Sequence, residues 1–448
     1  TYAMTLPGFR PEVGDMFGQK KHGGFLAPGM DFAFGFTGDG YIDRALQNDW
    51  LICNDSVVSP ASSNALEDLQ LRISLEPIRD LKIDLTANRT RNRSREIQYM
   101  FEGMPDTRSG NFSMRIISIG SAFERPAGDG YHSGTFERFR RNLDVIRDRV
   151  ESQFLGAQYP QGSILAGKTF DPANGTISKH SPDVMIPAFL AAYTGKSARN
   201  SALDFFPSLF SMMPNWRITY TGLTKIAWFK KNFRSVNLNH AYRSTYSVGS
   251  YNTFQSFMSY MGDIGFVEDV QSGNPIPSSR FDISMVSINE QFSPLIGMDA
   301  TLKNGLTAKV EYKTSRILNL SMSACQLVET ASRDFVIGLG YKIVNFNLFS
   351  GRNVKDSKNR VSHDLALRAD ISFRNQSALC RDIQQGFAQA TNGNKALKIS
   401  CSADYTLSRL LTLRLYYDRQ QNTPLVSSSS YPVVSADFGF SMKFSLTR

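Results

Sequence analysis

Six apolar residues occupy every second position near the end of the chain. Ala436, Phe438, Phe440, Met442, Phe444 and Leu446 alternate without exception with Ser435, Asp437, Gly439, Ser441, Lys443 and Ser445. Successive side chains of a strand point to opposite faces, so this segment has one apolar face and one polar face. Long strands of this kind are typical of the wall of an outer-membrane β-barrel.

The same alternation recurs in a region before residue 124 and through the second half of the chain. Clear examples are Leu69–Leu75, Leu81–Ala87 and Leu306–Tyr312. No run of 18 apolar residues occurs, so no transmembrane helix is expected. We predict an all-β protein, a transmembrane antiparallel β-barrel segment of about 14 strands with a helical and loop insertion.

The chain divides into four regions by its periodicity. A Gly/Pro-rich loop region covers 1–65, with a short strand near Met30–Phe36, and barrel strands cover 66–123 and 214–446. The segment 124–213 is an insertion, in which apolar residues recur every three or four positions between Phe136 and Val150. This spacing predicts an amphipathic helix over about 135–154. Its apolar stripe is expected to pack on neighbouring loops, either inside the lumen or outside the wall.

Turn and loop lengths suggest the orientation of the wall. Tight turns are predicted at Asn304-Gly305 and Ser408-Arg409, and long connections at Asn375–Asn394 and Gln420–Pro432. Short turns are periplasmic and long loops extracellular in bacterial barrels, which fits a periplasmic C-terminus. Strands are also expected near Phe112–Phe123 and at Lys225–Phe229.

The alternation sorts residues into two predicted environments. A charged side chain facing lipid at mid-bilayer costs about 2–4 kcal/mol, so the charged faces are expected to line the lumen. Lumen-facing candidates are Arg243, Lys309, Glu311, Lys313, Arg368, Asp370, Arg374, Asp404, Arg414, Asp418 and Lys443. Lipid-facing candidates are Leu397, Ile399, Leu413, Leu415, Phe438, Phe440, Met442 and Phe444.

The sequence predicts no catalytic, cofactor or metal site. Gly162–Thr169 matches a phosphate-binding loop by its letters, but neither a strand before it nor a helix after it is expected. The five histidines are scattered and no cysteine pair has zinc-site spacing, although a Cys380–Cys401 disulfide stays open. The net charge of +10 comes from scattered residues, so nucleic acid is not an expected partner.

Three longer strings carry a resemblance to a known family. They are Pro214–Leu223, Leu238–Gly249 and Glu290–Gly297. Together they resemble the C-terminal part of the SprA/Sov family, the outer-membrane translocon of the type 9 secretion system of Bacteroidetes. The family-motif residues are Trp216, Arg217, Tyr220, Gly222, His240, Tyr242, Arg243, Tyr246, Gly249, Gln291, Phe292, Pro294 and Gly297.

The resemblance implies a non-enzymatic channel that passes folded cargo proteins bearing a C-terminal signal. It also implies a single barrel of about 36 strands, of which this chain would be an arc. Expected partners are a PorV-like barrel, a plug protein, periplasmic secretion components and membrane lipid. The expected location is the outer membrane of a Gram-negative, Bacteroidetes-like bacterium.

Two other functions remain compatible with the pattern. One is a complete, smaller outer-membrane porin or transporter barrel. The other is a soluble all-β hydrolase, in which the apolar face of the last strand would be buried in a sandwich.

Overall fold

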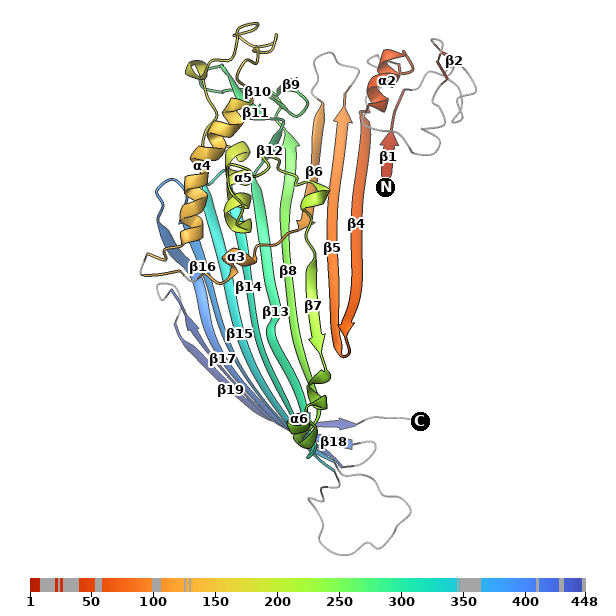
Figure 1. Cartoon of the computed structure of the whole chain (residues 1–448), viewed down its shortest axis with the longest axis vertical. Helices are drawn as coiled ribbons and strands as arrows, with labels where there is room; N and C mark the ends of the chain where they lie inside the picture. The colour runs from red at the N-terminus through yellow and green to blue at the C-terminus, as the bar shows by residue number, and fades with distance from the viewer. Residues whose placement is uncertain are drawn as a thin grey trace, which may run out of the picture.

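Long antiparallel strands dominate the computed structural model (Figure 1). It describes residues 1–8, 21–22, 25–26, 40–52, 59–98, 106–124, 126–128, 130–344, 346, 364–407, 411–426 and 431–444. The main sheet has 14 strands in the order β1-β4-β5-β6-β8-β13-β14-β15-β16-β17-β18-β19, with β7 and β12 beside this path. The expected antiparallel sheet of about 14 strands is therefore confirmed.

The strands of the main sheet are long and mostly joined to their sequence neighbours. Their bounds are β1 Tyr2–Thr5, β4 Ala61–Ile78, β5 Leu81–Ile97, β6 Thr107–Arg115, β7 Asn215–Tyr220, β8 Phe233–Thr253, β12 Phe281–Ile283, β13 Met285–Leu302, β14 Leu306–Ser321, β15 Gln326–Ile343, β16 Leu365–Asp382, β17 Ala388–Thr406, β18 Leu411–Pro424 and β19 Val433–Phe444. Within the described residues, β1 and β19 are the two edges and the sheet is open.

One strand position of the sheet is shared by two half-strands. Both β6 and β7 lie between β5 and β8 and run antiparallel to them, β6 near one end and β7 near the other. Met114 pairs with Arg89 of β5, and Asn215 pairs with Thr86 of the same strand. The chain therefore leaves the sheet after Arg115, forms the insertion, and returns at almost the same height.

The insertion is mainly helical and packs on one end of the sheet (Figure 1). It contains α3 Ile119–Ala122, α4 Gly134–Ser152, η2 Pro172–Asn174, α5 Pro182–Thr194 and η3 Leu209–Ser211. The amphipathic helix expected over about 135–154 is confirmed as α4. It begins where the Ser133 hydroxyl accepts a hydrogen bond from the Phe136 amide, at 3.2 Å.

The apolar stripe of α4 faces the interior of the insertion. Phe139 is fully buried and meets Phe189 of α5 in an edge-on contact at 6.1 Å. Helix α5 starts with Pro182 and ends at Gly195, whose φ of 74° provides the left-handed cap. A small sheet of β9 Met258–Met261, β10 Ile264–Glu268 and β11 Pro275–Ser279 adds Phe266 to the same core.

The remaining elements lie at the ends of the strands. Helix α2 Tyr41–Gln47 buries Tyr41 and Ala45 with Trp50, and β2 Lys21–His22 pairs with β3 Phe25–Leu26. At the other end of the sheet, η4 Gly222–Lys225 and α6 Ala227–Asn232 link β7 to β8. No helix in the described parts of the chain is long and apolar enough to cross a membrane.

Several expectations need correction. Asn375–Asn394 is not a long connection, because β16 continues to Asp382 and β17 begins at Ala388. Lys225–Phe229 is not a strand, because residues there close a 3-10 turn and begin α6. The strand expected at Phe112–Phe123 ends at Arg115, so the insertion begins at residue 116 rather than 124.

Other expectations have different outcomes. Cys380 and Cys401 are free thiols and do not form a disulfide with each other. Gly162–Thr169 forms turns, closed by the bridge between Gln158 and Thr169. The strand near Met30–Phe36 and the turn Ser408-Arg409 lie outside the described residues. The connection expected at Gln420–Pro432 begins later, because β18 continues to Pro424, and residues 427–430 of it lie outside the described residues.

Candidate functional site: a two-faced wall with an anchored insertion

One face of the sheet carries a continuous set of apolar side chains, which we call the apolar band. The pairing between strands is unbroken from β14 to β16, so paired residues on these strands share a face. On β5 and from β14 to β19, the band contains Leu81, Ile83, Leu85, Ala87, Leu306, Ala308, Val310, Tyr312, Phe335, Ile337, Leu339, Tyr341, Leu365, Leu367, Ala369, Ile371, Phe373, Leu397, Ile399, Cys401, Ala403, Leu411, Leu413, Leu415, Tyr417, Phe438, Phe440, Met442 and Phe444. All eight lipid-facing candidates belong to it.

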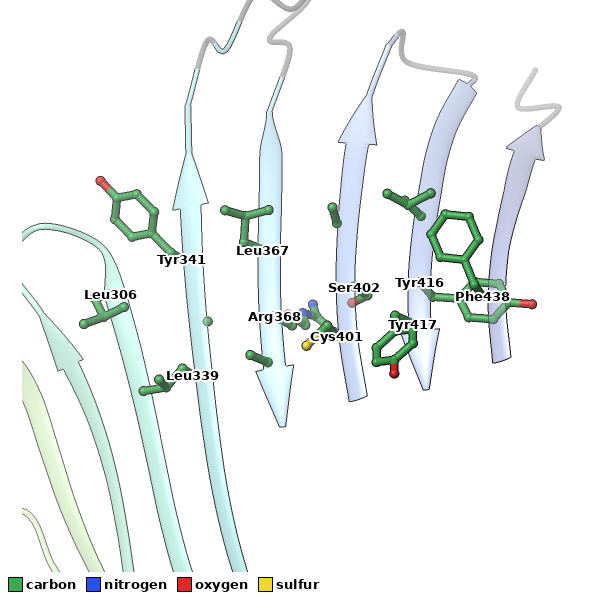
Figure 2. A pocket seen from close by; sticks show the side chains of 14 residues that line it. Leu306, Leu339, Tyr341, Leu367, Arg368, Cys401, Ser402, Tyr416, Tyr417 and Phe438 are labelled. Carbon is green, nitrogen blue, oxygen red and sulfur yellow. The ribbon is translucent and has the colours of Figure 1, made fainter. Parts of the chain in front are cut away.

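The apolar band is exposed rather than covered by other parts of the described chain. Phe438 is 72% exposed and Met442 is 66% exposed. Figure 2 shows side chains of Leu339, Leu367, Tyr417 and Phe438 on neighbouring strands, around a shallow hollow of about 350 Å³. A water-soluble protein rarely exposes so large a contiguous apolar surface.

Aromatic residues lie at the ends of the band. Tyr312, Phe335, Phe373 and Tyr417 each stand at one end of the apolar run of their strand, and Phe438 of β19 pairs with Tyr417. Aromatic girdles at both boundaries of an apolar band are the characteristic feature of barrels that cross a membrane.

The opposite end of the band has its own aromatic group beside α6. Trp228, Phe229 and Phe233 have ring centroids 4.9 to 5.9 Å apart, and Trp228 is 62% exposed. Lys230 and Lys231 occupy the last turn of the same helix. This mixture of aromatic and basic side chains suits a membrane–water boundary.

Residues of the opposite face are polar, and we call this surface the polar face. All eleven lumen-facing candidates lie on it, because each pairs across the strands with residues whose side chains also point away from the apolar band. Glu311 forms ion pairs with Lys309 at 3.1 Å and with Lys313 at 2.9 Å. Between strands, Arg374 pairs with Asp334 at 2.9 Å and Arg414 with Asp404 at 3.6 Å. The face therefore presents charges of both signs.

The insertion packs on the same face as the apolar band. On β14, Leu318 and Leu320 are fully buried beneath the insertion, and Val310 of the band has the same parity. On β15, Leu327 is buried and Leu339 is 47% exposed, again with the same parity. Each of these two strands thus contributes to the apolar band along one part and contacts the insertion along the next part. Helix α4 therefore lies on the side of the sheet opposite the polar face.

Two buried ion pairs attach the insertion to the sheet. The first joins Arg316 of β14 to Glu290 of β13 at 2.8 Å, with both side chains at least 92% buried. Glu290 accepts hydrogen bonds from the Ser118 hydroxyl at 2.7 Å and from the Tyr242 hydroxyl at 2.9 Å. Arg316 also donates to the Ser121 carbonyl at 2.7 Å. These bonds fix the start of α3 on the sheet.

The second pair lies on the next two strands. Arg381 of β16 is 1% exposed and pairs with Glu329 of β15 at 3.1 Å. The same guanidinium donates to the Tyr131 carbonyl at 2.7 Å and lies over the Phe136 ring. The sequence analysis did not identify these residues. They could have been found, because each is a charged residue at a position whose side chain points to the same face as the apolar band.

A carboxylate also holds the start of α4. Glu124 accepts two hydrogen bonds of 3.2 Å from the Thr135 amide. Burial acts to raise the pKa of Glu124, but the hydrogen bonds from Thr135, Ser133 and Gly134 together outweigh it and leave that pKa below its usual value.

Some family-motif residues form one aromatic cluster at the boundary between band and insertion. Tyr242 lies between Trp216 at 4.5 Å and Phe292 at 4.8 Å, measured between ring centroids. His240 Nδ1 is 2.7 Å from the Leu295 carbonyl oxygen, within a bulge of β13.

The other motif residues are distributed around this cluster. A Cβ on Gly297 would lie 2.7 Å from the Pro294 ring, and one on Gly222 would meet the Tyr220 ring. Arg217, Arg243 and Gln291 lie on the polar face, and Tyr246 packs under the insertion. Gly249 lies further along β8. The motif residues therefore gather largely at the junction between the band and the insertion.

Among the described residues, no group of three or more His, Cys, Asp or Glu side chains could hold a metal ion. No model of a protein family matches the chain, and no curated protein matches it. Among solved structures, the chain is similar to OmpT, an outer membrane protein of Vibrio cholerae, in its in-vitro folded trimer form. The sequences are 9% identical, the match covers 85% of this chain and 99% of that chain, and the TM-score is 0.22.

Proposed function

We propose that this chain forms an arc of the wall of an outer-membrane β-barrel that conducts proteins. The apolar band carries the proposal, because it is exposed, bounded by aromatic residues and backed by a polar face. On β16 the band covers the nine residues from Leu365 to Phe373. A transmembrane strand needs about 9–11 residues, so this length suits a bilayer.

The polar face supports a water-filled lumen. Its charges alternate in sign along and between strands, as in the Lys309–Glu311–Lys313 group. A polypeptide can slide along such a surface without meeting one large attractive patch. The work of the channel is then steric and electrostatic, with energy supplied by other components.

The assignment to the type 9 translocon rests on the motif resemblance and on the open edges. An isolated sheet with two open edges is not tolerated in lipid, so β1 and β19 require further strands. The proposed partners are secreted cargo with a C-terminal signal, a PorV-like barrel, a plug protein and periplasmic secretion components. The runner-up, a smaller closed porin, needs β1 and β19 to meet.

Accessibility of a spin label tests the membrane assignment. A nitroxide at Ile371→Cys should be reached by oxygen, which concentrates in lipid. A nitroxide at the neighbouring Ser372→Cys should instead be reached by a water-soluble nickel complex. Both positions lie on β16 with opposite parity, so each is the matched control of the other. Equal nickel accessibility at both positions would contradict a membrane wall.

Extraction from native outer membranes tests the translocon assignment. A polypeptide several times larger than the 50.1 kDa of this chain, purified together with a second barrel protein, is the expected result. A stable barrel of about this mass alone would instead favour the porin.

A further inference from the structure

A short turn at the base of the insertion exposes apolar side chains. It runs from Pro207 to Met213 and includes η3. Phe210 is 96% exposed, Leu209 is 46% exposed and Met213 is 43% exposed. Single exposed apolar residues are common, but three within five positions form a local cluster.

The register of the sheet gives the height of this turn. The Met213 amide donates to the Arg115 carbonyl at 3.1 Å. Arg115 follows Met114, which pairs with Arg89 of β5. The apolar band on β5 ends at Ala87, only two residues before Arg89. The turn therefore lies just beyond the boundary of the band.

Packing places the turn on the face of the band. Phe206, directly before the turn, contacts Phe112 at 5.6 Å, and Phe112 belongs to the core beneath the insertion. The Tyr246 hydroxyl donates to the Phe205 carbonyl at 3.1 Å. The insertion and the band share this face, so the turn lies on the same side of the sheet as the exposed apolar surface.

An apolar groove adjoins the turn. It has a volume of about 340 Å³ and is lined by Met114, Ile116, Ile117, Leu190 and Met213, among others. Lys196 and Asp204 contribute the charged part of its lining, and Lys196 is exposed. The groove therefore combines apolar walls with one ammonium group and one carboxylate.

We propose that this turn anchors the insertion in the membrane. Phe210 enters the interfacial layer of the bilayer, beside the apolar groove. The inference rests on the proposed function, because it needs the apolar band to face lipid. The bilayer is the favoured occupant because the turn lies on the same face as the band and at its boundary.

The insertion offers a matched control at its far end. Ile164 is 68% exposed and apolar, like the residues of the turn. Its neighbour Gly162 approaches Met258 of β9, which follows the end of β8 beyond Thr253. Ile164 is therefore remote from the band and should remain in water.

Three spin-labelled variants test the inference in the full polypeptide that carries these residues. Phe210→Cys, Ile164→Cys and Ile371→Cys are made with the native cysteines, including the four within these 448 residues, replaced by alanine. The variants are reconstituted into vesicles of phosphatidylethanolamine and phosphatidylglycerol. The ratio of oxygen to nickel-complex accessibility is measured at each label. Folding of each variant is checked by its mobility on gels before and after heating.

The expected result is a ratio several-fold higher at positions 210 and 371 than at position 164. If position 371 is in lipid and position 210 matches position 164, the anchor is wrong and the barrel wall stands. If position 371 itself is in water, the proposed function fails and the anchor fails with it.

Discussion

Buried charged residues hold together the two layers of this molecule. Glu290 and Arg316 are both almost fully buried and between them bind Ser118, Ser121 and Tyr242. Replacing a buried ion pair by apolar residues is often harmless, so the pair is not itself proof of stability. The position of the pair, however, specifies where the insertion docks. The two charges can stay buried only when the insertion supplies their hydrogen-bond partners.

Removing one partner of this pair should loosen the insertion. Glu290→Gln leaves the Arg316 guanidinium buried without its counter-charge, at an expected cost of about 3–5 kcal/mol. The exposed pair of Lys179 and Asp144, at 2.7 Å, is the control, and Asp144→Asn should cost about 0–1 kcal/mol. Amide hydrogen exchange in α3 and α5 measures both, and equal exchange in the two variants would contradict an anchoring role.

A second residue makes the insertion sensitive to pH. Burial raises the pKa of Asp183, and hydrogen bonds from Ser279 and Ser278 oppose that rise only in part. The folded insertion thus prefers the protonated acid. Its contribution to stability is complete below the ordinary Asp pKa of about 3.9 and declines as pH rises through the higher folded pKa.

Asp183→Asn should remove this dependence. The asparagine side-chain oxygen can still accept the bond from the Ser279 amide, at 3.2 Å in the native protein, but it carries no charge. Protease resistance of the insertion should fall from pH 4 to pH 7 in the native protein and stay more nearly constant in the variant. Identical pH profiles would count against a buried, raised Asp183.

At the scale of elements, the alternation of side chains predicted most strands but not their full length. Residues 375–382 of β16 and 388–394 of β17 lack an apolar alternation, and they were expected to form a loop. These parts of the strands lie beyond the apolar band. Their lateral hydrogen bonds keep them extended, and no lipid selects apolar side chains there.

The insertion shows a different limit of sequence reasoning. The period of α4 predicted the helix, since its apolar residues must face one side. The side of the wall that it covers depends on the parity of Leu318, Leu320 and Leu327 relative to the band. That the insertion packs on these three residues is a contact between segments far apart in the sequence, which no local pattern contains.

Adjacent positions on β16 should respond oppositely to a charge. Ile371→Arg places a guanidinium within the apolar band, at an expected cost of about 2–4 kcal/mol in a bilayer. Ser372→Arg adds the same charge to the polar face and should change stability little. Urea unfolding in lipid vesicles compares the two variants, and an equal loss of stability in both would contradict the assignment of faces.

At the scale of the whole molecule, the divided strand explains how so large an insertion leaves the wall without opening it. Strand β5 pairs with β6 along Arg89–Glu96 and with β7 along Leu81–Thr86. Strand β8 pairs with both half-strands in the same way. The Ile116 amide donates to the Ser244 carbonyl of β8, and the Ser244 amide donates to the Asn215 side-chain oxygen. The hydrogen bonds along β8 are therefore nearly continuous across the gap between the two half-strands. The insertion can therefore leave the sheet while the strands on either side remain joined.

The free edge of β19 decides between an arc of a large barrel and a complete small one. A photo-crosslinking amino acid at Ser441, on this edge strand, should join the chain to protein outside these 448 residues. The same residue at Ser372, inside the sheet between β15 and β17, should join only neighbouring strands of this chain. Mass spectrometry of the linked peptides identifies the partner strand. A link from position 441 to Tyr2–Thr5 of β1, or to the part of β4 from Leu66 to Ile78 that β1 does not cover, would mean that the sheet closes on itself, because these residues form the opposite edge. The small porin would then replace the translocon as the function of this wall.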